Sequence, residues 1–100
     1  MENNKEDIGV LFELSAPYSF EGVEYTEINL DLESLTGRDI SQAKKEWTAL
    51  GNFSAVISTD MDFAVFVAAR ASNLPAEFFY DLPAKDFTKV AQTVTNFLLS

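Results

Sequence analysis

The residues of this chain that could do chemistry are its carboxylates. The sequence has 16 Asp and Glu but no His and no Cys, so the commonest general base, thiol nucleophiles and most transition-metal ligands are missing. The pair Asp60 and Asp62 supplies two oxygen ligands, whereas a calcium loop needs several at alternate positions and a bracing Gly. We interpret Asp60 as a helix N-cap and Asp62 as a partner of the helix dipole.

Enzymatic chemistry is not expected from the remaining motifs. The four glycines stand alone at positions 9, 22, 37 and 51, so no phosphate-binding loop or dinucleotide fingerprint is present. A hydrolase with paired carboxylates needs a concave substrate site, which is hard to build in 100 residues that must also form a core. The sequence predicts a protein without catalytic residues, cofactor or bound metal.

Aromatic side chains are the better candidates for a functional role, as contacts with a partner or a second copy. Phe78, Phe79 and Tyr80 are consecutive, and neighbours on a helix point about 100° apart, so they cannot all face inward. Phe66 lies in the segment 63–71, in which every residue but Arg70 is apolar. The alternative is that these aromatics are absorbed by the core of the chain. The candidate contact residues are Phe66, Phe78, Phe79 and Tyr80.

The composition predicts one soluble intracellular domain. The chain has 47% hydrophobic residues and a formal net charge of −9, which favours a folded protein, disfavours nucleic-acid binding and suits a basic partner. The N-terminus has no apolar stretch of the signal-peptide type, and no apolar run is long enough for a membrane span. We expect a mobile, disordered tail over residues 1–7 and a single α+β domain over residues 8–100.

Alternating hydrophobicity predicts an antiparallel hairpin of strands 8–15 and 23–31. Glu21-Gly22 is interpreted as a tight turn in which Gly supplies a positive φ, although a longer loop is an alternative. Pro17 is expected at an edge or in a bend. On the second strand Thr26 and the apolar residues after it should face the core. The opposite face should be wet and acidic, either as a docking surface for a basic partner or as an ordinary solvated face; it comprises Tyr25, Glu27, Asn29, Asp31 and Glu33.

A change of period to about 3.6 residues predicts helices near 37–50, 61–72, 76–81 and 84–98. Thr36 and Asp39 form an imperfect capping box, and Gly51 closes the first helix. The loop 51–59 is apolar enough to pack down. The helix 61–72 is apolar on all sides, which indicates that it is central or shared with another chain. Because one thin layer should not cover this helix, and because the free edges of a two-stranded hairpin favour pairing, we expect a weak homo-oligomer held by helix–helix or sheet-edge contact.

Several short phrases follow one another in a fixed order: Leu14-Ser15-Ala16-Pro17, Phe20-Glu21-Gly22-Val23, the strand 25–30, Leu35-Thr36-Gly37-Arg38-Asp39-Ile40, the segment 68–75, Leu82 with Asp86, and Asn96-Phe97-Leu98-Leu99. Together they resemble the tail assembly chaperone family of long-tailed bacteriophages and prophages. The resemblance covers residues 10–99, and it is carried by their order and spacing. The hairpin turn lacks the Asp or Asn and the Lys common in the family, and segment 51–60 matches no characteristic phrase.

This resemblance implies a specific, non-enzymatic function. Members of the family bind the tape measure protein, keep it soluble and help to recruit tail tube subunits around it. They act in the cytoplasm of the infected bacterium and are absent from the finished tail, and many are also made in a longer, frameshifted form. The family has no catalytic motif, so the resemblance assigns no site residues.

Two other classes of function remain open from the sequence. One is a small acidic cytosolic adaptor or regulatory domain whose hairpin pairs with a basic or strand-forming ligand. The other is a structural component of a phage tail, such as a tube or terminator subunit. A tape measure gene immediately downstream would distinguish the chaperone from both.

Overall fold

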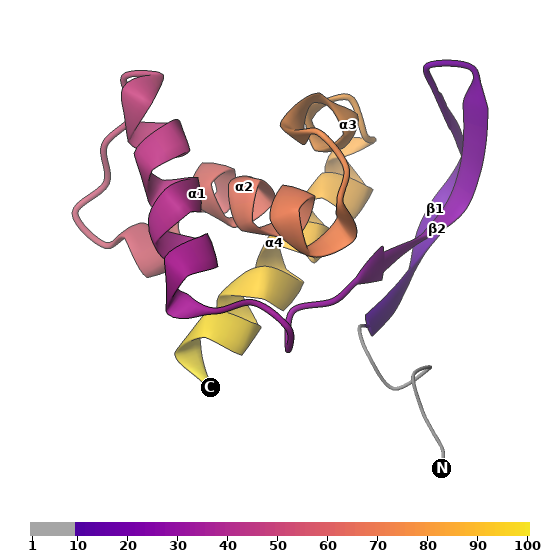
Figure 1. Cartoon of the computed structure of the whole chain (residues 1–100). Helices are drawn as coiled ribbons and strands as arrows, with labels where there is room; N and C mark the ends of the chain where they lie inside the picture. The colour runs from indigo at the N-terminus through magenta and orange to yellow at the C-terminus, as the bar shows by residue number, and fades with distance from the viewer. Residues whose placement is uncertain (1–9) are drawn as a thin grey trace, which may run out of the picture.

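The computed structural model describes residues 10–100 and has the predicted α+β arrangement. An antiparallel two-stranded hairpin is followed by four α-helices and one short 3-10 helix, and α2 lies at the centre of the helices (Figure 1). The expected tail over residues 1–7 and the first residues of the expected strand lie outside the described part. The elements are β1 (Val10–Phe20), β2 (Val23–Leu30), α1 (Gly37–Ala49), η2 (Ile57–Thr59), α2 (Met61–Ser72), α3 (Ala76–Tyr80) and α4 (Ala84–Leu99).

The hairpin turn is the tight two-residue turn that the sequence predicts. Glu21 has φ 51° and Gly22 has φ 81°, and two successive positive φ values are what a type I′ turn requires. Gly22 adopts this conformation without steric cost, whereas Glu21 carries some strain because a Cβ disfavours the left-handed region. The alternative of a longer loop is therefore wrong.

The strand β1 is longer than predicted and is interrupted in the middle. Phe12 pairs with Ile28 and Glu13 with Glu27, but the next pair is Tyr18 with Tyr25, so five steps of β1 face two steps of β2. Pro17 lies within this irregularity, where the missing N–H breaks no ladder. Pro17 thus lies at an irregular point of an edge strand, in agreement with the expectation of an edge or a bend, and the strand resumes after it.

The register shift also corrects the predicted faces of β2. Ile28 and Leu30 are buried as expected, but Thr26 is exposed and Tyr25, predicted to face water, packs on the core. The ring of Tyr25 lies 4.9 Å from that of Phe78. The cause is the irregularity in β1, since an uneven register increases the local twist and turns the tip of the hairpin relative to its base.

The core lies between the hairpin and the helices and is centred on α2. This helix packs against α1, α3, α4, η2 and β2, so its all-round apolar sequence is explained by a central position within the chain. Its buried residues are Phe63, Ala64, Val65, Val67 and Ala68. The premise that one thin layer would leave this helix uncovered is wrong, because neighbours pack on several of its sides.

A buried carboxylate joins the hairpin to the helices. Asp86, in the first turn of α4, is 2% exposed. One of its oxygens accepts a bond from the Ser15 hydroxyl at 2.9 Å, and both accept from the Ser15 N–H at 3.1 and 3.2 Å. Two phrases that lie 71 residues apart in the sequence are thus in direct contact. The bond fixes the irregular part of β1 against α4.

The segment between α1 and α2 differs from the expectation that it packs down. Phe53 is 88% exposed and Val56 is 57% exposed, and only Ile57, in the unpredicted helix η2, is half-buried. Leu50 is also exposed, because α1 ends at Ala49 and Leu50 is its C-cap. Gly51, with φ 91°, closes the helix as predicted. This end of the molecule therefore exposes several large apolar side chains.

Candidate partner-binding groove

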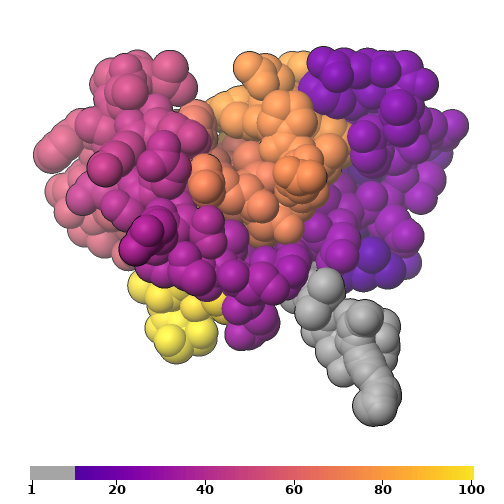
Figure 2. Space-filling model, in the orientation of Figure 1, coloured from indigo at the N-terminus to yellow at the C-terminus, as the bar shows by residue number. Residues whose placement is uncertain are grey.

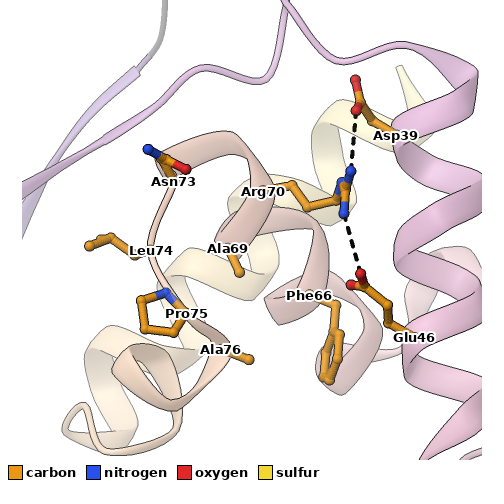
Figure 3. Close-up of a pocket in the computed structure, with 9 residues that line it drawn as sticks. All are labelled: Asp39, Glu46, Phe66, Ala69, Arg70, Asn73, Leu74, Pro75 and Ala76. Atoms are coloured by element: carbon orange, nitrogen blue, oxygen red, sulfur yellow. Dashed lines mark ion pairs between the residues drawn. The ribbon is translucent and has the colours of Figure 1, made fainter.

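One of the predicted contact residues, Phe66, lines a groove beside α2. Its volume is about 500 Å³, and it lies between α1 and the connection from α2 to α3 (Figure 3). In Figure 2 the orange residues after α2 fill the space between α1 and the hairpin. We call this the Arg70 groove, and its lining residues are Asp39, Glu46, Phe66, Ala69, Arg70, Asn73, Leu74, Pro75 and Ala76.

The polar side of the Arg70 groove is formed by one cation between two carboxylates. Arg70 lies 3.6 Å from Asp39 and 3.6 Å from Glu46, both on α1. These separations are those of ion pairs rather than hydrogen bonds, and the three side chains are between 32% and 48% exposed. Exposed pairs of this length contribute little to stability because water and salt screen them. Arg70 can therefore leave this position at small cost.

The capping box of α1 positions the first of these carboxylates. The backbone N–H of Thr36 donates to Asp39 at 2.9 Å, and the N–H of Asp39 donates to the Thr36 hydroxyl at 3.3 Å. This confirms the predicted capping box, with Asp in the place usually held by Glu or Gln. The bond from the Thr36 N–H is the largest cause that lowers the pKa of Asp39, and the hydroxyl of Thr36 and the charge of Arg70 lower this pKa further.

We expect the Asp39 carboxyl to titrate below its ordinary value. A pKa that is lower in the folded state contributes stability at pH values above the unfolded pKa, and this contribution is lost as the pH falls through the folded pKa. An NMR titration of the side-chain carboxyl measures this value. Because the backbone bond dominates, Thr36→Ala and Arg70→Met should each restore only part of the shift. An Asp39 that titrates at its ordinary value in the wild-type protein would contradict the capping geometry.

The opposite wall of the groove depends on how α2 ends. Asn73 is the C-cap in the left-handed conformation, with φ 61° and ψ 37°. Its N–H and that of Leu74 both donate to the carbonyl of Ala69, which is a common way to close a helix. Pro75 and Ala76 follow immediately and begin α3. The left-handed conformation of Asn73 thus reverses the chain after α2, so that the residues that follow it form this wall of the groove.

Two substitutions at this C-cap should have opposite outcomes. Asn73→Ala should lower the free energy of unfolding by about 1 kcal/mol, because Cβ disfavours the left-handed region and Ala lacks the local hydrogen bonding that makes Asn tolerant. Asn73→Gly should be neutral or slightly stabilising. Urea denaturation of both variants measures the difference. Equal stabilities would show that the left-handed turn does not close α2 in solution.

The structure separates the four predicted contact residues. Phe66 is half-buried and lines the Arg70 groove on the same side as Glu46 (Figure 3). Phe78 and Phe79 are fully buried inside the chain. Tyr80 is 45% exposed, so the expectation that one of the three consecutive aromatics reaches the surface is confirmed. Phe66 and Tyr80 remain candidates for contacts with another protein.

Tyr80 belongs to a different surface from the Arg70 groove. Its ring lies 5.8 Å from that of Phe87, on α4. Partial burial raises the pKa of Tyr80, and the negative charges of Asp62 and Asp60 raise it further. Asp60 caps α2 by accepting from the N–H groups of Asp62 and Phe63, as predicted. The candidates from the sequence therefore do not converge on one site.

Sequence reasoning missed the ionic part of the groove. Asp39 and Glu46 are seven residues apart in α1, which places them on one face, about 10 Å apart along the axis. This spacing was visible in the sequence, as was the lone cation Arg70 in an apolar helix. What the sequence did not indicate is that α1 and α2 pack side by side in this register.

Residues 10–100 contain neither a candidate metal site nor a helix that could span a membrane. Within this part of the chain, no group of three or more Asp or Glu side chains is arranged to hold a metal ion. Over the same described residues, every helix is too short or too polar to cross a membrane.

Comparison with known protein families gives a match that covers nearly the whole chain. Residues 11–99 match the family model described as phage tail assembly chaperone proteins, E, or 41 or 14. No curated protein and no solved structure matches the chain. The matched region begins in β1 and ends at the last residue of α4, so it contains the hairpin, the helical core and every residue of the Arg70 groove. The chain belongs to the phage tail assembly chaperone family.

Proposed function

We propose that this protein binds the tape measure protein of its phage, keeps it soluble and promotes assembly of the tail tube around it. The observation that carries the proposal is the family match over residues 11–99. It acts in the infected host cell and is absent from the mature virion. Its partners are the tape measure protein and, at a later step, the tail tube protein.

The surface of the chain supports a role in binding a protein. The Arg70 groove combines an apolar lining, which includes Phe66 and Leu74, with charged groups at one side. Such a combination suits a protein segment, because apolar contacts give affinity and the charges fix the orientation. The net charge of −9 favours a basic partner and opposes binding to phosphate backbones. The proposed function uses no catalytic residue, cofactor or metal.

A weak homo-oligomer is part of the proposal, and of the two bases that the sequence offered, the exposed helix and the hairpin edges, the second supports it. With α2 largely covered by its own chain, the support comes from the hairpin. The sheet has two strands, and in the described part of the chain each has one edge without a partner strand. Such edges favour pairing with another strand. Light scattering over a range of protein concentrations tests this, and a monomer at high concentration would contradict it.

Co-expression tests the proposed function directly. The tape measure protein of the same phage should be largely insoluble when expressed alone, and largely soluble and co-purified when expressed with this chain. A control with an unrelated acidic protein of similar size separates capture from a general effect of charge. A tape measure protein that stays insoluble with this chain would contradict the proposal.

A further inference from the structure

The Arg70 groove contains one cation held between two carboxylates, an arrangement that contributes little to the stability of the fold. Arg70 lies across the groove between two carboxylates, at 3.6 Å from each, and all three side chains remain partly exposed (Figure 3). Of the charged residues that line the groove, two are negative and one is positive. The groove therefore has one more carboxylate than cation, and the cation that it has is weakly held.

The spacing of the carboxylates indicates the shape of a complementary ligand. Asp39 and Glu46 are seven residues apart on one face of α1, which is two helical turns and about 10 Å. A helix that lies along α1 repeats the same spacing, so basic residues seven positions apart on it would meet both carboxylates. In Figure 3 Arg70 lies between the two carboxylates and Phe66 lies beyond Glu46, so an apolar residue on the same face of that helix, past the second basic residue, would lie over Phe66. This is the pattern of an amphipathic helix bound in a groove.

We propose that the Arg70 groove binds an amphipathic helix with Lys or Arg seven positions apart, and that Arg70 occupies one of these cation positions in the free protein. This inference rests on the proposed function, since the helix is a segment of the tape measure protein. Binding moves Arg70 away from Asp39 and Glu46, and the basic residues of the partner replace it. In the free protein, the positive charge of Arg70 reduces the repulsion between Asp39 and Glu46.

Two substitutions that should change the affinity for a basic helix in opposite directions test this inference. The probe is a labelled synthetic amphipathic helix of about five turns with two Lys seven positions apart and Leu on the same face, and its binding is measured by fluorescence anisotropy. Arg70→Met should tighten binding about threefold to fivefold, because it removes the competing cation and keeps the aliphatic stem. Glu46→Gln should weaken binding by a similar factor. Glu46 is preferable to Asp39 for this purpose, since Asp39 also caps α1.

Matched controls remove the same charges elsewhere. Lys89→Met, on α4, and Glu24→Gln, on β2, should leave the affinity within about twofold of wild type, because salt screens charges at a distance. A second peptide with Glu in place of both Lys should not bind. Thermal unfolding of each variant shows whether it remains folded.

Several results would overturn the inference. If Arg70→Met weakens binding and the acidic peptide binds best, Arg70 is itself the receptor for a carboxylate. Equal binding of the basic peptide to all variants, or no binding to wild type and to Arg70→Met, would also overturn it.

Co-expression with the full tape measure protein distinguishes this failure from failure of the proposed function. If wild type, Arg70→Met and Glu46→Gln bind the basic peptide equally while all three solubilise the tape measure protein, the groove assignment fails and the function stands. If wild type does not solubilise it while the peptide behaves as expected, the function fails and the groove assignment stands.

Discussion

Replacing Phe78 with Ala should lower the free energy of unfolding by about 4 kcal/mol. Phe78 is fully buried, and its ring makes edge contacts with four aromatic rings whose centroids lie between 4.9 and 5.3 Å away, those of Tyr18, Phe20, Tyr25 and Phe79. Truncation leaves a cavity between the hairpin and α3 and removes these contacts together. For a domain of this size the loss is a large share of the total stability.

Chemical denaturation of wild type and variant measures this effect. Phe53→Ala is the matched control, because Phe53 is 88% exposed and makes the same change in composition; its stability should stay within about 0.5 kcal/mol of wild type. A small effect for Phe78→Ala would mean that the tip of the hairpin does not pack on α3 in solution. These data also separate the two interpretations of Phe78 that the sequence left open, since truncation of a core residue changes stability whereas truncation of a contact residue changes only binding.

Replacing Asp86 with Ala should cost about 2 kcal/mol and should loosen the hairpin more than the helices. The carboxylate is 2% exposed and accepts bonds from both the N–H and the hydroxyl of Ser15. Its removal leaves these two donors without their partner, although Ser15 itself is exposed and water can replace part of the loss. Amide hydrogen exchange should therefore speed up in β1 and β2 before it does so in α2.

A double-mutant cycle with Ser15→Ala isolates the bond to the hydroxyl. The two substitutions should be non-additive by about 1 kcal/mol, because each removes one end of the same interaction. Lys85→Ala, at the neighbouring exposed position of α4, serves as the control and should be close to neutral. Additive effects, or a uniform increase of exchange over the whole chain, would show that the bond does not hold the hairpin specifically.

Local patterns were sufficient to predict most of the fold. The hairpin turn, the capping box at Thr36, the N-cap at Asp60 and the four α-helices depend on interactions within a few residues, and the structure confirms each. The register shift near Pro17 was not predictable in detail. It depends on contacts of Ser15 with Asp86 and of Tyr18 with Phe78, which lie 71 and 60 residues away in the sequence.

The candidate site was predictable only in part, because it too depends on contacts between residues that are distant in the sequence. The aromatic types that can bind a partner are visible in the sequence, but their exposure depends on tertiary packing. Phe78 and Phe79 are core residues because the hairpin and the helices enclose α3, whereas Phe66 lines the Arg70 groove beside α1. The Arg70 groove joins residues from α1, α2 and the following connection. Periodicity alone does not show which helices are neighbours.

NMR mapping of the complex tests the central claim, that this chain captures a helix of the tape measure protein in the Arg70 groove. The isotope-labelled chain is titrated with the bound tape measure segment, and amide shifts are followed for residues 10–100. We predict that the largest changes fall in residues 39–46 and 66–76, with little change at Tyr80 or in the exposed loop around Phe53. Changes centred on Tyr80, on that loop or on the hairpin, with residues 39–46 and 66–76 unchanged, would contradict the account.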